Sequence, residues 1–101
     1  MPHNNSNKSM KPNHLYEIVD KVGEDTFKYG ISSEPIDADG MSDRMRKQVN
    51  YLNRLYEWVR FFGRILLYDI PGKKEARRIE KEHIKEYEKI HGRKPKGNPR
   101  Y

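Results

Sequence analysis

The chain has 101 residues and no cysteine; 36% of the residues are charged, 34% are hydrophobic, and the net charge is +6. This length suits one domain with a small core, and the lack of cysteine excludes a disulfide framework and a thiolate metal site. No apolar run approaches the roughly 20 residues of a membrane span, and no signal peptide is visible in this segment.

The first part of the chain predicts a β-hairpin. Residues 1–12 are polar and rich in Asn and Ser, which is typical of a disordered leader or linker, so the domain is expected to occupy residues 13–101. Residues 14–21 and 26–32 contain β-favouring apolar side chains and predict two strands. The intervening Val-Gly-Glu-Asp at 22–25 supplies the turn.

A loop and a long helix are expected next. Residues 32–40 contain Pro, Asp and Gly and predict a loop, after which Ser42 is placed to cap a helix. Apolar side chains then recur at helical spacing through residues 43–60. These side chains are Met45, Val49, Leu52, Tyr56 and Val59.

The last part of the chain predicts a strand, a helix and a tail. The continuous apolar run at residues 64–70 predicts a buried strand. Residues 73–90 predict a helix that ends before Gly92, and residues 93–101 form a tail. The fold class is therefore a small α/β (α+β) domain of order β-β-α-β-α, with a three-stranded, mainly antiparallel sheet flanked by helices.

The positive charge is concentrated in the C-terminal third. Residues 1–70 hold ten basic and ten acidic side chains, whereas residues 71–101 hold eleven basic and five acidic ones. Such a basic stretch is expected of a nucleic-acid binder, but a solvated helix face with ion pairs four residues apart gives the same pattern. Both interpretations stay open on charge alone.

One carboxylate breaks the apolar stripe of the last helix. The stripe consists of Ala76, Ile79, Ile84, Tyr87 and Ile90. Glu80 lies one turn after Ala76 and one turn before Ile84, near the middle of this stripe. A core-facing carboxylate is expected to be paired or metal-bound, because burying an unpaired charge is costly. Glu80 could instead pair with an arginine of the long helix, reach solvent at the stripe's edge, or face elsewhere if the helix phase differs by one residue.

The segment "EARRIEKEHIKEY", residues 75–87, resembles the final helix of the GIY-YIG nucleases. Their pattern there has Glu-Ala, a second Glu, an Ile-Lys pair and a later Asn, which correspond here to Glu75-Ala76, Glu80, Ile84-Lys85 and Asn98. The resemblance implies that Glu80 binds a catalytic divalent ion, Mg²⁺ or Mn²⁺. The order β-β-α-β-α is similar to the core of that superfamily.

The two first strands carry parts of the motifs that give the superfamily its name. "HLY" stands where Gly-Ile-Tyr is expected, which implies that Tyr16 is the catalytic tyrosine, and His14 replaces the usual Gly. "KYG" stands where Tyr-Ile-Gly is expected, so Gly30 matches but Lys28 replaces the second tyrosine. A one-residue shift at a bulge would recruit the neighbouring Tyr29 or Phe27 instead.

On the long helix the superfamily carries an Arg, often followed by His four residues later. Arg44 and Gln48 have this spacing, and Arg46 is the fallback for the arginine. The blocks "YGISSEPIDADGMSDRMRKQVNYLN", "IPGKKEARRIEKEHI" and "GRKPKGN" resemble the URI-type nuclease toxin domains of bacterial polymorphic toxins more narrowly. This resemblance covers residues 13–98.

The resemblance implies a function for the whole domain. It implies a metal-dependent endonuclease that degrades nucleic acid, DNA rather than RNA, in the cytoplasm of a competitor cell. It also implies delivery as the C-terminal part of a larger secreted carrier and neutralisation by a dedicated immunity protein. The alternatives are a non-catalytic nucleic-acid-binding module with the same fold, and a cellular or mobile-element nuclease without an immunity partner.

The same resemblance implies roles for named residues. Tyr16 is expected to be the general base, Arg44 the phosphate clamp, and Glu80 the metal ligand, with Lys28 and Asn98 in support. The expected nucleic-acid contacts are Arg46, Arg77, Lys81, Arg93, Lys94 and Lys96, and the residues expected behind the site are Tyr29, Gln48 and His83. Without the resemblance, a strand tyrosine such as Tyr16 is more often a packing residue than a catalytic one, and His83 is a half-buried, hydrogen-bonded residue before it is a base or ligand. The aromatic group Trp58, Phe61 and Phe62 is then either core or a contact for the immunity protein.

Overall fold

The computed structural model describes residues 11–99. It contains five elements in the predicted order: β1 (Pro12–Asp20), β2 (Asp25–Ser32), α1 (Asp43–Leu55), β3 (Phe61–Pro71) and α2 (Lys73–His91). Residues 1–10 of the predicted leader, and Arg100 and Tyr101 of the tail, lie outside the described residues. Across residues 11–99, neither helix is both long and apolar enough to span a bilayer.

The three strands form one antiparallel sheet in the order β2-β1-β3. The prediction of a buried third strand is wrong, because within residues 11–99 β3 pairs with β1 alone and forms an edge of the sheet. Its side chains Leu67 and Tyr68 are 41% and 60% exposed. A continuous apolar run does not distinguish an edge strand from a central one, and the central position belongs to β1, whose Leu15, Tyr16 and Ile18 are at most 1% exposed.

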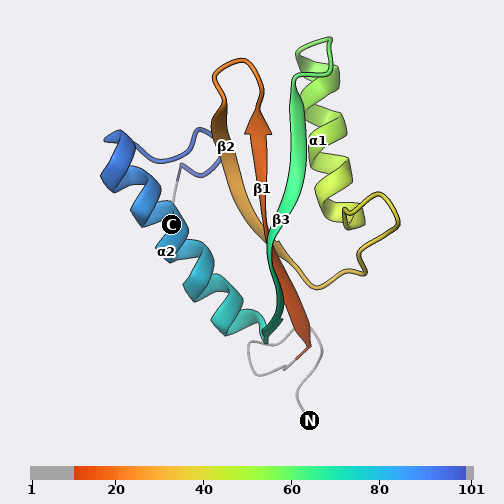
Figure 1. Ribbon diagram of the computed structural model, residues 1–101, viewed down its shortest axis with the longest axis vertical. Helices are drawn as coiled ribbons and strands as arrows, with labels where there is room; N and C mark the ends of the chain where they lie inside the picture. The colour runs from red at the N-terminus through yellow and green to blue at the C-terminus, as the bar shows by residue number, and fades with distance from the viewer. Residues whose placement is uncertain (1–10, 100–101) are drawn as a thin grey trace.

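The two helices pack on opposite faces of this sheet (Figure 1). Leu15 packs with Ile70 of β3 and Ala76 of α2, whereas Ile18 packs with Val49 of α1 and with Phe61. Because successive side chains of a strand point to opposite faces, Tyr16 shares the α1 face with Ile18. The domain therefore has two small cores separated by β1.

Helix α1 is shorter than predicted: it ends at Leu55 rather than at Arg60. Glu57 adopts a left-handed backbone conformation with φ of 61°, which an α-helix does not contain. The Asn53 side chain then accepts hydrogen bonds from the N–H groups of Arg60 and Phe61 at 2.9 and 2.7 Å and joins the end of α1 to the start of β3. This turn leaves Val59, which was expected on the apolar stripe, 69% exposed.

The N-terminus of α1 is capped from outside the helix. Ser42 occupies the N-cap position, as predicted, but its hydroxyl is bonded to the buried His14 ring at 3.0 Å and caps no backbone group. Glu34 of the preceding loop instead accepts a hydrogen bond from the Arg44 N–H at 2.9 Å. The loop thereby fixes the first turn of α1, which carries Arg44.

The chain after α2 returns to the free edge of β2. Gly92 adopts φ of 75° and ends α2, as the sequence predicts. The Gly97 N–H donates to the Phe27 carbonyl at 2.7 Å, and the Asn98 side chain accepts from the Tyr29 N–H at 2.7 Å and donates to the Tyr29 carbonyl at 3.0 Å. A Cβ at Gly97 would lie 2.8 Å from Cβ of Lys28, so only glycine allows this close approach.

Candidate active site

Tyr16 lies at the centre of the site, on the α1 face of the sheet. Its cross-strand partner on β2 is Gly30, and the absence of a side chain there leaves room for the tyrosine ring. The Tyr16 hydroxyl donates a hydrogen bond to Oε1 of Gln48 on α1 at 2.7 Å. The ring is therefore held between a strand backbone beneath it and a helix side chain at its tip.

Lys28 lies on the same face as Tyr16, and Tyr29 does not. Lys28 is the cross-strand partner of Ile18, whereas Tyr29 is the partner of Glu17 and packs on the α2 face against the Leu15 cluster. A bulge is present, but it lies between Lys28 and Thr26 and leaves Phe27 without a cross-strand partner. The shift that would bring Tyr29 to the Tyr16 face is absent from this hairpin, so Lys28 and not Tyr29 lies on that face.

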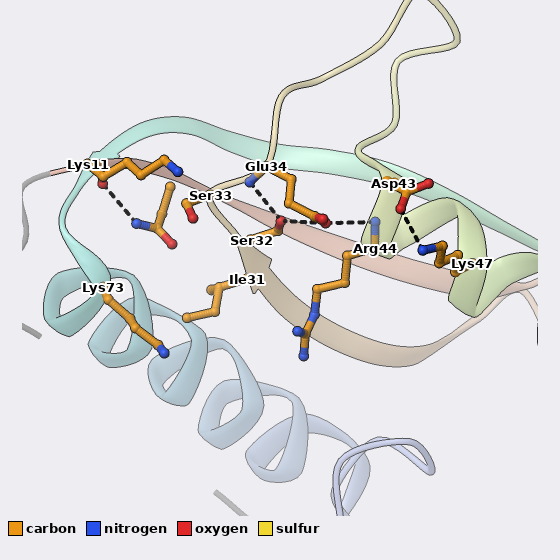
Figure 2. Close-up of a pocket in the computed structure, with 10 residues that line it drawn as sticks. Lys11, Ile31, Ser32, Ser33, Glu34, Asp43, Arg44, Lys47 and Lys73 are labelled. Carbon is orange, nitrogen blue, oxygen red and sulfur yellow. Dashed lines mark hydrogen bonds and ion pairs between the residues drawn. The ribbon is translucent and has the colours of Figure 1, made fainter. Parts of the chain in front are cut away.

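Arg44 extends from the first turn of α1 past β2 toward α2, as Figure 2 shows. It lines a cleft of about 460 Å³ together with Lys47 of α1, Lys73 of α2 and Lys11. One side of this cleft is formed by the end of β2 and the loop after it, with Ser32, Ser33 and Glu34. Arg44 therefore connects the Tyr16 face with an open, cation-rich surface.

Glu80 reaches the same group of side chains from α2. It is half-buried, and burial raises the pKa of its carboxyl group, while Lys28, Arg77 and Arg44 act in the opposite direction. Because β2 is an edge strand, a side chain from α2 can approach the Tyr16 face around its free edge. Within residues 11–99 the Glu80 carboxylate makes no hydrogen bond and no ion pair, so it is half-buried without an arginine partner from α1.

The electrostatic environment links the four side chains. Burial raises the pKa of Tyr16, and the neighbouring Arg44 guanidinium partly offsets this effect. Burial also lowers the pKa of Lys28, as does the charge of Arg44, while Glu80 acts to raise it. The charges of Arg44 and Glu80 thus act on the pKa of both Tyr16 and Lys28, although the four side chains come from four different elements.

The donor set bears on whether a divalent ion fits. The described part of the chain contains no group of three or more His, Asp or Glu side chains arranged to hold a metal. Glu80 is the one carboxylate among the residues that act on Tyr16. A hard cation such as Mg²⁺ is commonly held by one or two carboxylates together with water and substrate phosphate. The single half-buried Glu80 carboxylate, which makes no ion pair within the described residues, fits this mode of binding and does not fit a site made entirely of protein ligands.

The residues expected behind the site are divided between two places. Gln48 contacts Tyr16 directly. The His83 ring is bonded to the Ile79 carbonyl at 2.9 Å and lies edge-on to Tyr29, with 5.6 Å between ring centroids. Asn98 orients the chain end against Tyr29, as described above, and makes no hydrogen bond with Glu80 in the described part of the chain.

The basic residues expected to contact nucleic acid differ in how far they are committed to the fold. Arg46 is held by Asp37 at 2.7 Å and by Asp39 at 2.8 Å, and it holds the pKa of Asp39 down to about 2. Arg93 is paired with Asp25 at 2.9 Å and Lys94 with Glu88 at 3.2 Å. These pairs join loops to helices and strands. Arg77, Lys81 and Lys96 are exposed.

The cationic cleft was missed at the sequence level. Its lysines Lys11, Lys47 and Lys73 are far apart in the chain, and two of them lie in the first 70 residues, where the charges sum to zero. Glu34 and Asp43 also line this cleft, and Lys47 is paired with Asp43 at 2.8 Å. Asp37, Asp39 and Asp20 are instead bound by Arg46 and Arg60 outside it. A sum of charge along the sequence carries no sign of this arrangement.

Comparison with known proteins gives one family. No curated protein and no solved structure matches the chain. A family model described as URI fold toxin 2 matches residues 6–92, a segment that includes Tyr16, Arg44 and Glu80 and excludes Asn98. The match confirms the resemblance noted in the sequence, and the chain belongs to the URI fold toxin 2 family.

Proposed function

We propose that this toxin domain is a metal-dependent endonuclease that hydrolyses phosphodiester bonds, with DNA as its principal substrate. The observation that supports this activity best is that the charges of Arg44 and Glu80 act on the pKa of both Tyr16 and Lys28, although α1 and α2 carry them on opposite sides of the sheet. These groups comprise a proton acceptor, two cations and a metal-binding carboxylate. Phosphodiester hydrolysis uses each of these groups. The proton acceptor activates water, the cations stabilise the phosphoryl oxygens, and a metal ion held by the carboxylate stabilises the leaving oxygen.

Tyr16 accepts the proton of the attacking water in this proposal. Only the phenolate can accept this proton, and burial raises the pKa of Tyr16, so the phenolate form is disfavoured. The Arg44 guanidinium favours the phenolate, and Gln48 fixes the position of the hydroxyl. Arg44 also presents a planar fork of donors that suits the scissile phosphate.

Glu80 would hold the divalent ion, which when bound supplies Lewis-acid stabilisation of the phosphoryl and leaving oxygens. Lys28, Arg44 and Arg77 all act on this carboxylate, so the local field disfavours a cation in the absence of substrate. The negative charge of a phosphate reverses this field. Metal binding is therefore expected to be weak in the free protein and to strengthen with nucleic acid.

Membership of a toxin family supports the cellular context of the proposal. We infer that the domain is delivered by a larger secreted carrier, acts in the cytoplasm of a target cell and is neutralised by an immunity protein. A second candidate, a non-catalytic nucleic-acid-binding module, is favoured by one observation: Lys28, and not a tyrosine, lies on the Tyr16 face of β2.

A nuclease assay distinguishes the two. Supercoiled plasmid DNA and a structured RNA are incubated separately with the purified protein and Mg²⁺ or Mn²⁺, with EDTA as the control. Nicking or linearisation that EDTA abolishes supports the endonuclease. Binding of both polymers without metal-dependent cleavage supports the non-catalytic module.

A further inference from the structure

A second cavity adjoins the candidate active site on the α1 face. It has a volume of about 340 Å³ and lies between β2 and α1. Ile18, Phe27 and Leu52 form its apolar floor, and the 62% exposed Tyr51 ring stands at its side. Neither the fold nor the proposed chemistry assigns any function to this cavity.

The cavity is connected with the proposed chemistry through two side chains. Gln48 lines it and also accepts the hydrogen bond of Tyr16. Lys28 lines it from the other side and interacts with Glu80. A group bound in the cavity would therefore lie directly beside a phosphate placed at Tyr16, Lys28 and Glu80.

Lys47 lines both this cavity and the cationic cleft of Figure 2. A single extended ligand can thus occupy both places. The cleft offers positive side chains suited to phosphates, whereas the cavity offers an apolar floor, an aromatic ring and an amide. An alternation of anionic groups and flat, polar-edged rings is the chemistry of a nucleic-acid strand.

We infer that this cavity binds a nucleobase of the strand that is cut, next to the scissile phosphate. The inference rests on the proposed function. The cavity volume falls within the range of about 300–1000 Å³ of small-ligand sites, and Tyr51 supplies a surface on which any base can stack. The ammonium groups of Lys28 and Lys47 at the rim meet the phosphates on either side of the base.

This placement restricts the substrate. A base inside a duplex is stacked and paired, and it must leave the stack to enter a cavity between a strand and a helix. Single-stranded nucleic acid, or a duplex that is already distorted, is therefore bound in preference to regular duplex. Because stacking is tolerant of base identity, the cavity confers strand selectivity without strict sequence preference.

Binding measurements on Glu80→Gln test this inference without cleavage. A fluorescent single-stranded oligonucleotide is compared with a strand of equal length in which tetrahydrofuran replaces every nucleoside, so that the phosphates remain and the bases are lost. Each strand is titrated against Glu80→Gln alone and in combination with Tyr51→Ala. The matched control is Tyr68→Ala, because Tyr68 is equally exposed, at 60%, and lies on β3 away from the cavity.

Tyr51→Ala is expected to weaken binding of the base-containing strand about tenfold, within the range measured for base–aromatic stacking. The strand without bases is expected to bind more weakly to the parent protein by a similar factor and to be unaffected by Tyr51→Ala. Equal effects of Tyr51→Ala and Tyr68→Ala, or equal losses on both strands, would overturn the inference. If the protein discriminates the two strands through Tyr51 but never cleaves, the base-binding inference stands and the proposed endonuclease activity is wrong. If it cleaves plasmid DNA without this discrimination, the endonuclease activity stands and the base-binding inference is wrong.

Discussion

The Tyr16 ring lies across the backbone of Gly30, its partner on the neighbouring strand. A Cβ atom at position 30 would lie 2.6 Å from Cε1 of that ring and would also meet the phenol oxygen. Glycine is thus required at this position by the tyrosine and not by its own backbone angles. Gly30 therefore has a physical role in this chain: it makes space for the Tyr16 ring.

Gly30→Ala tests this relationship. The added methyl group must displace the Tyr16 ring from Gln48 or push the two strands apart, so we expect a loss of about 1–3 kcal/mol in the free energy of unfolding and a large loss of cleavage. Gly23→Ala is the control, because a Cβ there meets its nearest neighbour at an ordinary 3.6 Å. Chemical denaturation of both variants measures the difference, and equal stability would contradict the steric account.

Glu80→Gln separates function from stability. Burial raises the pKa of Glu80 above its unfolded value, so the charged form is disfavoured in the folded state and the carboxylate opposes folding above that pKa. We expect Glu80→Gln to retain or raise the thermal midpoint at neutral pH and to lower cleavage at least about 100-fold. Glu86→Gln, the same change at an exposed position of α2, should alter neither. A destabilised Glu80→Gln variant would show instead that the carboxylate serves the fold.

The sequence predicted the elements that local patterns control. Apolar spacing located both helices and the hairpin to within a few residues, except at the end of α1, and Gly92 indicated the end of α2. The resemblance to a known family, and not periodicity or element order, grouped Tyr16, Arg44 and Glu80 as candidates for one site. Strand order within the sheet was not accessible, since a buried and a partly exposed apolar strand have the same composition.

The features that the sequence could not supply depend on contacts between distant residues. Asn53 ends α1 by bonding to the backbone at the start of β3, and Glu34 caps α1 from a separate loop. The bulge at Phe27 decides that Lys28 and not Tyr29 faces Tyr16. Each of these features depends on one side-chain contact or on one shift in strand register. Because such features do not repeat along the chain, no sequence pattern predicts them.

The buried His14 predicts that stability falls with pH below about 6.5, its unfolded pKa. Burial lowers the pKa of His14 in the folded protein, and the charge of Glu34 only partly opposes this. The unfolded chain then binds more protons than the folded one between the two pKa values, so the free energy of unfolding decreases as pH falls through this window. His14→Gln should have a flatter pH dependence there, as measured by denaturation at several pH values. An unchanged slope would assign the effect to other groups.

Asn98 predicts a structural role for the chain after α2. Its side chain makes two hydrogen bonds with the backbone of Tyr29 and is 9% exposed. Asn98→Ala leaves both backbone groups without these partners, so we expect a loss of about 1–3 kcal/mol in the free energy of unfolding. Asn50→Ala, at an exposed position of α1, is the control and should be nearly neutral. Hydrogen exchange should also show faster exchange at the Tyr29 amide in Asn98→Ala alone.

Substitution of Lys28 distinguishes the proposed nuclease from the alternative, a non-catalytic nucleic-acid-binding module. If Lys28 stabilises charge as the phosphodiester bond breaks, Lys28→Met should lower kcat at least tenfold and change KM little, because the interaction strengthens only in the transition state. Lys47→Met removes an exposed lysine of the cationic cleft and should do the reverse, raising KM and reducing the salt dependence of binding.

The pH profile gives a second measure of the same residue. Burial and Arg44 lower the pKa of Lys28, so its charge is lost at a lower pH than that of an ordinary lysine and cleavage should decline on the alkaline side. Lys28→Arg, whose side chain remains charged throughout this range, should shift that decline to higher pH. If Lys28→Met and Lys47→Met have the same effect on kcat and KM, Lys28 is one more phosphate contact and the catalytic proposal must rest on Tyr16, Arg44 and Glu80 without it.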